Sequence, residues 1–497
     1  MSRQIIHPHA LKAIPVAVAL ALSAAAPVAA APKPPGFRTS EAAMIQLSAD
    51  LPNGAKVTPI ISSGDTVGDF LFEGIPDGVG LRPGPANGTV DVYVAHEQST
   101  IPFRDQQDFQ DSSISALTIS SKGGPRQGDV LDAWVALGPE EGFLRFCSAS
   151  MSGPAEGLDD YVFFTGEETS DVVDGVQRGF AVVLNTDTGE HTDVPGMGRL
   201  NHENTVIIPG GWDRLAMITT DDTFVAATSQ MYMYIADDQD AIFADEGELY
   251  AFRVTGSNGT PVADPNDPFN EANDYLDVSV GESMQGEFIP VPREIAVGDQ
   301  TVLEEWSNDN NVFQAIRLED LAADKNDPRV VYIADTGASR VVPNLDTGRM
   351  HRPPGQGLAD NGRVWKMVLN EDDPTKVDSL TIFADGDAVG SDVYVPFTSP
   401  DNVDTSKKSL MVQEDADSAQ IWQYKFNQNS WRSVATVTDE DFESSGIVDA
   451  SKWFGQGAWI LTVQGHGTNV AEDDTSKPGT LIKRESGQLL LMRIPAS

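Results

Sequence analysis

One kind of segment recurs six times in this sequence: a run of apolar or β-branched residues that ends in polar, mostly acidic residues. Short runs of this kind, bounded by Gly, Asn, Asp and Pro clusters, are typical of β-strands. The six segments are residues 90–97 (VDVYVAHE), 161–168 (YVFFTGEE), 215–222 (LAMITTDD), 330–335 (VVYIAD), 410–415 (LMVQED) and 459–466 (WILTVQGH). Their spacing is too irregular for a solenoid.

A second type of segment follows several of these strands. Its members are residues 180–184 (FAVVL), 247–254 (GELYAFRV), 362–369 (GRVWKMVL), 421–426 (IWQYKF) and 487–494 (GQLLLMRI). Residues 185–189 (NTDTG) come directly after the first of them and indicate a hairpin turn. A strand with an acidic end and a hairpin partner, repeated in this way, predicts an all-β fold: a six-bladed β-propeller with short inserted loops and helices. A β-sandwich array is the alternative.

The first thirty residues are typical of a secretory signal peptide. Arg3 and Lys12 precede or flank an apolar run over 13–26, and Val28-Ala29-Ala30 offers small residues for cleavage. The run is too short for stable membrane insertion. We expect a signal peptide at 1–30, a leader at 31–56 and a single propeller domain at 57–497, in a monomer exported to the periplasm or outside the cell.

The charge of the chain restricts its partners. The 497 residues carry 33 Lys and Arg against 75 Asp and Glu, a formal net charge of −42. Tight binding to nucleic acid is electrostatically disfavoured at this charge, and divalent cations are the natural counterions. The single cysteine excludes a disulfide scaffold and a cysteine-based zinc finger.

In a propeller the ends of strands from successive blades converge on the central channel, so acidic strand ends would face one another there. Such a ring of carboxylates requires cations, and calcium is abundant outside the cell. For any single acid, an exposed strand cap is the alternative. The candidate metal ligands are Glu97, Glu167, Glu168, Glu203, Asp221, Glu319, Asp401, Glu414 and Asp415.

Cys147 stands in Arg145-Phe146-Cys147-Ser148, shortly before the Glu167-Glu168 pair. A buried inert thiol is the usual state of a lone cysteine. A thiolate within a carboxylate cluster would instead indicate a softer transition metal, with iron the plausible choice, beside calcium.

Other short patterns add or exclude chemistry. Arg317 and Glu319 alternate so that both side chains lie on one face of an extended segment, which places an anion-binding fork beside a carboxylate. In each of the dipeptides His96-Glu97 and His202-Glu203, only one side chain can easily enter a shared site. The sequence has no Gly-x-Ser-x-Gly, P-loop, dinucleotide fingerprint or His-Glu-x-x-His, which disfavours serine acyl transfer and cofactor-dependent redox chemistry.

Taken together, the motifs resemble the PhoX-like alkaline phosphatase family of secreted, metal-dependent β-propeller enzymes. The resemblance covers residues 57–494, and it depends on the order of its motifs. These are 96–100 (HEQST), 145–147 (RFC), 165–168 (TGEE), 201–205 (NHENT), 219–222 (TTDD), 317–320 (RLED), 399–402 (SPDN), 412–415 (VQED), 444–447 (SSGI) and 463–466 (VQGH).

The resemblance implies hydrolysis of small phosphate monoesters by a cluster of iron and calcium ions. Cys147 and Glu203 would bind iron. Calcium would be bound, or metal ions bridged, by Glu167, Glu168, Glu319 and one acid among Asp401, Glu414 and Asp415. Arg317 would hold the phosphate in a catalytic group with Glu319 and Glu203.

Three alternatives stay open at this point. The site could hold calcium alone, because the residues that follow Cys147 (Ser148-Ala149-Ser150) differ from the glycine-rich turn of the family. The chain could be a calcium-dependent hydrolase similar to phytase or lactonase propellers. It could also be a non-catalytic propeller that calcium stabilises for binding.

Overall fold

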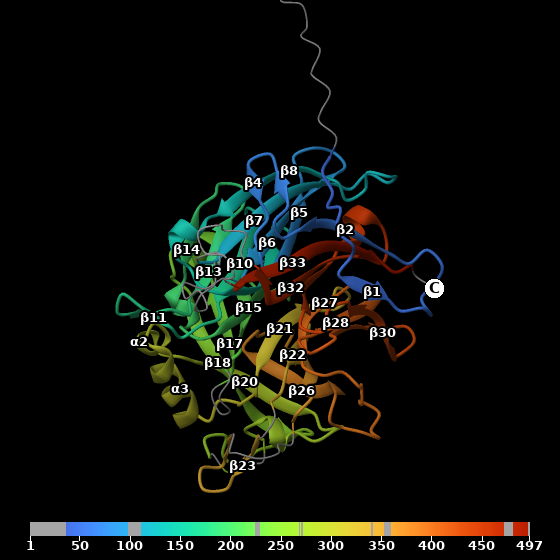
Figure 1. Cartoon of the computed structure of the whole chain (residues 1–497). Helices are drawn as coiled ribbons and strands as arrows, with labels where there is room; N and C mark the ends of the chain where they lie inside the picture. The colour runs from blue at the N-terminus through green and yellow to red at the C-terminus, as the bar shows by residue number, and fades with distance from the viewer. Residues whose placement is uncertain are drawn as a thin grey trace, which may run out of the picture. The chain divides into compact units, whose positions relative to one another are not determined.

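The computed structural model describes residues 36–97, 111–223, 229–267, 269, 272–338, 341–351, 359–471 and 481–495. They belong to one compact unit, residues 36–497 (Figure 1). The predicted signal peptide lies outside the described residues. Among the described helices, none is long and apolar enough to cross a membrane.

Sets of four antiparallel strands make up most of this unit. The first sheet contains β5 (Pro76–Pro83), β6 (Thr89–His96), β7 (Ser113–Ser120) and β8 (Val130–Leu137). The next contains β9 (Phe146–Ser152), β10 (Val162–Glu167), β13 (Ala181–Asn185) and β14 (His191–Asp193).

The middle of the chain forms one larger sheet. Its strands are β15 (His202–Ile207), β16 (Leu215–Asp221), β17 (Met231–Ala236), β18 (Glu248–Ser257), β19 (Thr260–Pro261), β20 (Met284–Pro290), β21 (Leu318–Ala323), β22 (Val330–Asp335), β25 (Arg363–Leu369) and β26 (Lys376–Asp385). In this sheet β20 pairs with β18 on one side and with β26 on the other. It therefore joins the outer edges of two four-stranded sets, which the sequence repeat does not predict.

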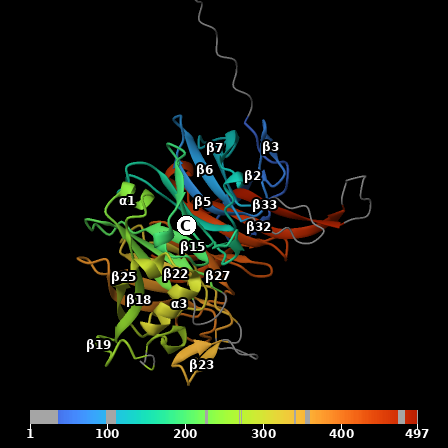
Figure 2. The same cartoon turned by 90° about the vertical axis from the view of Figure 1, so that its left-hand side faces the viewer.

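The two remaining large sheets each combine C-terminal strands with one N-terminal strand. One contains β27 (Pro400–Thr405), β28 (Ser409–Glu414), β29 (Gln420–Lys425), β30 (Ser430–Val437) and β1 (Ile45–Leu47). The other contains β31 (Glu443–Asp449), β32 (Ala458–Ala471), β33 (Leu481–Arg493) and β2 (Lys56–Ser62). Figures 1 and 2 show β2 beside β33, so the two ends of the unit are hydrogen-bonded within one sheet.

Short elements decorate these sheets. The small hairpins are β3 (Thr66–Val67) with β4 (Phe70–Leu71), β11 (Val172–Val173) with β12 (Val176–Gln177), and β23 (Val342–Asn344) with β24 (Arg349–His351). The helices are α1 (Gln239–Phe243), α2 (Arg293–Ala296), α3 (Gln300–Asp309) and α4 (Ser451–Phe454), with 3-10 turns η1 (Pro139–Glu141), η2 (Pro195–Met197) and η3 (Tyr275–Asp277).

The first strands of the four-stranded sets contact one another in a closed cycle: β5, β9, β15, β21, β27, β31 and again β5. Residues of all six of these inner strands line a cavity of about 440 Å³. A closed cycle of first strands around a channel is the arrangement of a propeller. The predicted all-β propeller is confirmed. Because β20 fuses two sheets into one, the sheets do not by themselves fix the number of blades, and six stays a prediction.

The six acid-ended segments of the sequence all form second strands, namely β6, β10, β16, β22, β28 and β32. Four of the five later segments pair with them as predicted; residues 247–254 instead form β18, which pairs with β17. The predicted turn at 185–189 joins β13 to β14. There the Asn185 side chain accepts hydrogen bonds from the Asp187 and Thr188 amides, and Gly189 takes a φ of 79°.

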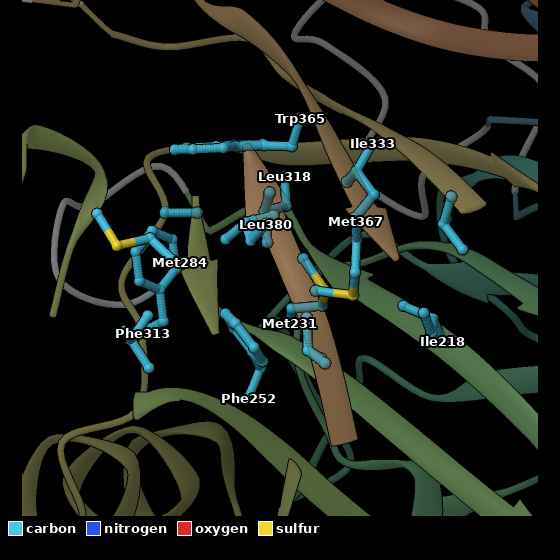
Figure 3. Close-up of a cluster of buried hydrophobic side chains, with 14 of the residues drawn as sticks. Ile218, Met231, Phe252, Met284, Phe313, Leu318, Ile333, Trp365, Met367 and Leu380 are labelled. Carbon is cyan, nitrogen blue, oxygen red and sulfur yellow. The ribbon is translucent and has the colours of Figure 1, made fainter. Parts of the chain in front are cut away.

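The largest hydrophobic cluster lies between the two sets of strands that β20 joins (Figure 3). Ile218, Met231 and Phe252 come from one set, and Leu318, Ile333 and Trp365 from the other. All are almost fully buried. This packing fixes β15 and β21 side by side, so that the first residues of the two inner strands meet at the channel.

Candidate metal centre

The beginnings of the inner strands bring ligand-type side chains together at one end of the channel. Each inner strand carries such a residue at its first or second position: Asp77, Cys147, Glu203, Glu319, Asp401 and Glu443. Because the second strand of each sheet runs antiparallel to the first, its last residues lie at the same end. Two sets of side chains therefore converge there.

The second strands contribute through neighbouring residue pairs. Glu167-Glu168, Asp221-Asp222 and Glu414-Asp415 each occupy the end of a second strand or the position after it. Successive side chains of an extended chain point to opposite sides, so only one carboxylate of each pair can face the channel. In all three pairs it is the second.

The first carboxylate of each pair binds groups of its own sheet instead. Glu167 accepts hydrogen bonds from the amides of Leu144, Gly179 and Phe180 and pairs with Arg178 at 2.7 Å. Asp221 accepts from the Thr223 amide and hydroxyl, at 3.1 and 2.7 Å. The Glu414 carboxylate accepts from two amides, those of residues 398 and 420, and from the indole of residue 422. The structure thus does not bring Glu167, Asp221 and Glu414 into the groups of possible metal ligands.

Nine of the converging residues form four overlapping groups, and within each group the ligand atoms lie within 4.8 Å of one another. The groups are Asp77–Glu97–Cys147, Cys147–Glu168–Glu203, Glu203–Glu319–Asp401 and Asp401–Asp415–Glu443. Cys147, Glu203 and Asp401 each belong to two groups and so link all four into one cluster, which we call the acidic cluster. It contains eight carboxylates and one thiol.

Sequence reasoning missed two members of the acidic cluster, Asp77 and Glu443, and a third nearby acid, Asp222. Asp77 and Glu443 stand at the beginning of inner strands, whereas the recurring pattern marks the ends of second strands. The signal that could have found them is an acid before a short stretch of small and apolar residues, as in residues 77–81 (DGVGL) and 443–448 (ESSGIV).

Burial and mutual repulsion raise the pKa values of groups in the acidic cluster. Removal from water, followed by the charge of Glu97, raises the pKa of Asp77 to about 7. Removal from water and then the charges of Glu319 and Glu168 raise the pKa of Glu203 well above its usual range. The pKa of the Cys147 thiol is raised first by burial and next by the charge of Asp77. Cations would relieve both effects.

Unsatisfied oxygen atoms support binding of cations. Among the described residues, Glu203 Oε2 and Asp401 Oδ1 are buried without a hydrogen-bond donor. Buried polar atoms usually find a partner, and an ion is one explanation for an exception. Both atoms belong to linking residues of the acidic cluster. The donor set therefore fits metal ions: carboxylate oxygens suit calcium, and the thiol suits a softer metal.

Arg317 lies beside the acidic cluster. Its Nε and Nη2 atoms donate to the two carboxylate oxygens of Asp222, at 2.8 and 2.7 Å. Nη2 also lies 3.3 Å from Glu319 Oε1, so the predicted same-face placement of Arg317 and Glu319 holds in the structure. This bidentate pair fixes the plane of the guanidinium group next to the carboxylates.

In each of the two His-Glu dipeptides the histidine and the glutamate point to opposite sides of the strand, as predicted. His96 is buried and lies 2.8 Å from both the Gly74 carbonyl and the Ser115 hydroxyl. His202 contacts the Gly198 carbonyl at 2.9 Å in the same manner. Burial lowers the pKa of both histidines to about 4, so they stay neutral. The glutamates, Glu97 and Glu203, face the acidic cluster.

We expect Gly78→Ala to disrupt the acidic cluster. A Cβ atom at Gly78 would lie 2.2 Å from the Ala149 nitrogen, so β5 and β9 would have to separate. That separation would move Asp77 away from Cys147, whose sulfur now lies 3.2 Å from Asp77 Oδ2. The free energy of unfolding should fall by about 1–3 kcal/mol, and the affinity for added calcium should fall with it. Denaturant titration and calcium titration calorimetry on the same preparation measure both.

Gly123→Ala is the matched control for this prediction. A Cβ atom at Gly123 meets nothing within 4 Å. This variant should stay within about 0.5 kcal/mol of the parent. Equal effects of the two substitutions would show that the close approach of β5 and β9 does not matter.

Comparison with known proteins places these observations in a family. Residues 140–468 match the family described as "Alkaline phosphatase PhoX". No match was found among curated proteins.

Among solved structures, PhoX of Pseudomonas fluorescens in complex with vanadate, a transition-state analogue, is similar over 92% of this chain and 98% of that chain. Its TM-score is 0.62 and its sequence identity 15%, which shows a shared fold. A GH93 α-L-arabinofuranosidase of Fusarium graminearum, solved with arabinobiose, has 9% identity and a TM-score of only 0.38, over 84% of this chain and 92% of that one. Since the family match spans well over half of the sequence, this chain belongs to the PhoX alkaline phosphatase family and is a phosphatase.

Proposed function

We propose that this phosphatase hydrolyses small phosphate monoesters with calcium and iron ions bound by the acidic cluster. The observation that carries the proposal is the linked arrangement of four ligand groups at one end of the channel, two of which contain Cys147. The thiolate-containing groups would hold iron through Cys147, Glu203 and Glu168. The oxygen-only groups would hold calcium through Glu319, Asp401, Asp415 and Glu443. Bound metal ions supply charge neutralisation at the phosphoryl oxygens and lower the pKa of water.

Residues of the chain itself position the phosphate. A phosphate ester meets strong repulsion from eight carboxylates, and Arg317 supplies a positive charge at their edge. Asp222 holds the guanidinium plane through two hydrogen bonds. The Thr336 hydroxyl donates to Glu319, which keeps that carboxylate oriented beside Arg317. We assign Arg317 to the phosphate, with Glu319 and Glu203 as the carboxylates nearest the reaction.

The remaining parts of the proposal concern the setting of the enzyme. Export through the segment at 1–30 would place the acidic cluster where calcium is abundant. Glu167, Asp221 and Glu414, with their carboxylates bound to groups of the sheets, are assigned a structural role. Their hydrogen bonds fix the strand ends from which Glu168, Asp222 and Asp415 project.

Cys147→Ala tests the metal assignment. Metal-loaded protein purified from its exported form is analysed for iron and calcium, and hydrolysis of p-nitrophenyl phosphate is measured on the same sample. We expect iron to be lost, calcium to be retained and kcat/KM to fall by about 10³-fold. Ser150→Ala, on the same strand, removes only a hydroxyl bonded to the Thr205 carbonyl and serves as control.

Each other outcome selects a different function. An active, iron-free Cys147→Ala protein that still needs calcium would overturn the iron assignment and favour a calcium-only hydrolase similar to phytase or lactonase propellers. Calcium without iron and without turnover in the parent protein would favour a binding propeller.

A further inference from the structure

A hollow of about 380 Å³ lies between loops of the last two sheets and collects positive charge. Its lining contains six cations and, among the described residues, a single acid, Asp449. The six cations are Lys325, Lys407, Lys408, Lys425, Arg432 and Lys452. We call this feature the basic hollow. Nearly a fifth of the chain's 33 Lys and Arg line it, in a protein whose net charge is −42.

The basic hollow is remote from the acidic cluster. Asp401 and Glu443 stand at the beginnings of β27 and β31, whereas the lysines at 407–408 and 452 follow the ends of the same two strands. At about 3.3 Å per residue, the two sites are separated by about 20 Å along β27. The cations of the basic hollow therefore do not serve to neutralise the acidic cluster.

The one lining acid is already neutralised. Lys325 Nζ lies 3.4 Å from both Asp449 and Asp404, and Asp449 also accepts a hydrogen bond from the Ser451 amide. In the part of the chain that the structure describes, no carboxylate lies within ion-pair distance of Lys407, Lys408 or Arg432. Among the described residues, three of the six cations thus have no ion pair, although the charge of Asp50 acts on Arg432 from farther away.

Arg432 is held in place within the basic hollow. Its Nε and Nη2 atoms donate to Oε1 of the buried Gln423, at 3.1 and 2.7 Å. Lys425 lies two residues after Gln423 on β29, so its side chain is on the same face, diagonal to Arg432 across the strand pair. Burial and then the charge of Arg432 lower the pKa of Lys425, so the two cations repel each other. An anion between them would remove that repulsion.

We propose that the basic hollow binds a compact soluble polyanion, a small molecule with two or more phosphate or sulfate groups. Five of the six cations are lysines, flexible point charges that suit several anionic groups at once. The volume is that of a small-molecule site. A nucleic acid would extend beyond the basic hollow and be repelled by the net negative charge of the chain, −42. An anionic membrane would be repelled by the same net charge.

The test uses inositol hexasulfate, a polyanion with no phosphate ester to hydrolyse. Binding to metal-loaded protein is measured by titration calorimetry for the parent and for the double variant Lys407→Ala/Lys408→Ala. Both lysines are exposed, so the fold should tolerate their loss. We expect the Kd to rise about 100-fold, since each lysine makes a charge-assisted contact. Lys122→Ala/Lys366→Ala removes the same charge elsewhere and should bind as the parent does.

Two further measurements locate the anion and identify its source. Hydrolysis of p-nitrophenyl phosphate should be unchanged in both double variants. This result would separate the basic hollow from the acidic cluster, and it does not depend on which metal ions the acidic cluster binds. Vesicles of phosphatidylglycerol and phosphatidylcholine should not sediment the protein. Equal binding of inositol hexasulfate by all three proteins would overturn the proposal, and so would lysine-dependent binding of the vesicles without binding of inositol hexasulfate.

Discussion

Replacing Glu168 by glutamine is expected to lower kcat/KM for a phosphate monoester by about 10³-fold, whereas the same change at the adjacent Glu167 should leave the activity of the folded enzyme nearly unchanged. Glu168 shares a ligand group with Cys147 and Glu203. Its charge would hold metal ions, and its pKa is raised by burial and then by the charge of Asp222. An amide in its place neither carries that charge nor bridges cations.

Glu167 is the matched control because the two residues differ only in the side of the strand they occupy. Its carboxylate accepts three backbone hydrogen bonds and pairs with Arg178. Glu167→Gln leaves the Arg178 guanidinium without its carboxylate partner, so the free energy of unfolding should fall by about 3 kcal/mol. Metal content should not change.

The readouts are elemental analysis, steady-state kinetics and denaturant titration of both variants. For Glu168→Gln we expect the metal content to fall, while the free energy of unfolding of the chelated protein stays at the parent's value. For Glu167→Gln we expect the metal content to stay unchanged and the free energy of unfolding to fall. If both variants lost metal equally, the distinction between carboxylates that bind their own sheet and carboxylates that face the channel would be wrong.

This pair of variants also shows where sequence reasoning about the site reaches its limit. Glu167 and Glu168 have the same chemistry, and the recurring pattern identifies both as the end of a strand. The choice between them depends on which side of β10 faces the channel, and that side is set by pairing with β9 and β13. The same holds for Asp221-Asp222 and Glu414-Asp415. The pattern found the strand ends, but the register selects the residue.

The inner strands were harder to recognise because small polar residues interrupt their apolar residues. Residues 146–152 (FCSASMS) form β9, yet they contain three serines and no sustained apolar run. A second strand such as β6, buried along nearly its whole length, gives the stronger signal. Asp77 and Glu443 lie outside the motifs that identified Cys147, Glu203, Glu319 and Asp401 on the other inner strands, and they were therefore missed. Only closure of the ring brings these two residues, at opposite ends of the sequence, into one cluster.

Metal removal should reveal the burial of the carboxyl groups in the acidic cluster, and their mutual repulsion, as a pH dependence of stability. Without cations, several carboxyl groups have raised pKa values in the folded state: the pKa of Asp77 rises to about 7, and burial followed by neighbouring charges raises those of Glu203, Glu319, Asp401 and Glu443 well above their usual range. The folded chain then binds more protons than the unfolded chain. The free energy of unfolding must therefore decrease as the pH rises from about 4 through the folded pKa values.

We expect the chelated protein to lose several kcal/mol of stability between pH 5 and pH 8, while the metal-loaded protein changes little, because its carboxylates are ionised throughout. The shift of Asp77 from 3.8 to about 7 corresponds to about 4 kcal/mol in all, of which about 3 kcal/mol falls between pH 5 and pH 8. Denaturant titrations at several pH values, with and without chelator, measure both curves. Asp77→Asn should flatten the curve of the chelated protein and stabilise it at pH 8, because it removes one buried charge. Equal stability of the chelated protein at pH 5 and pH 8 would mean that burial and mutual repulsion do not raise the pKa values of these carboxyl groups, and that the acidic cluster has no need of cations.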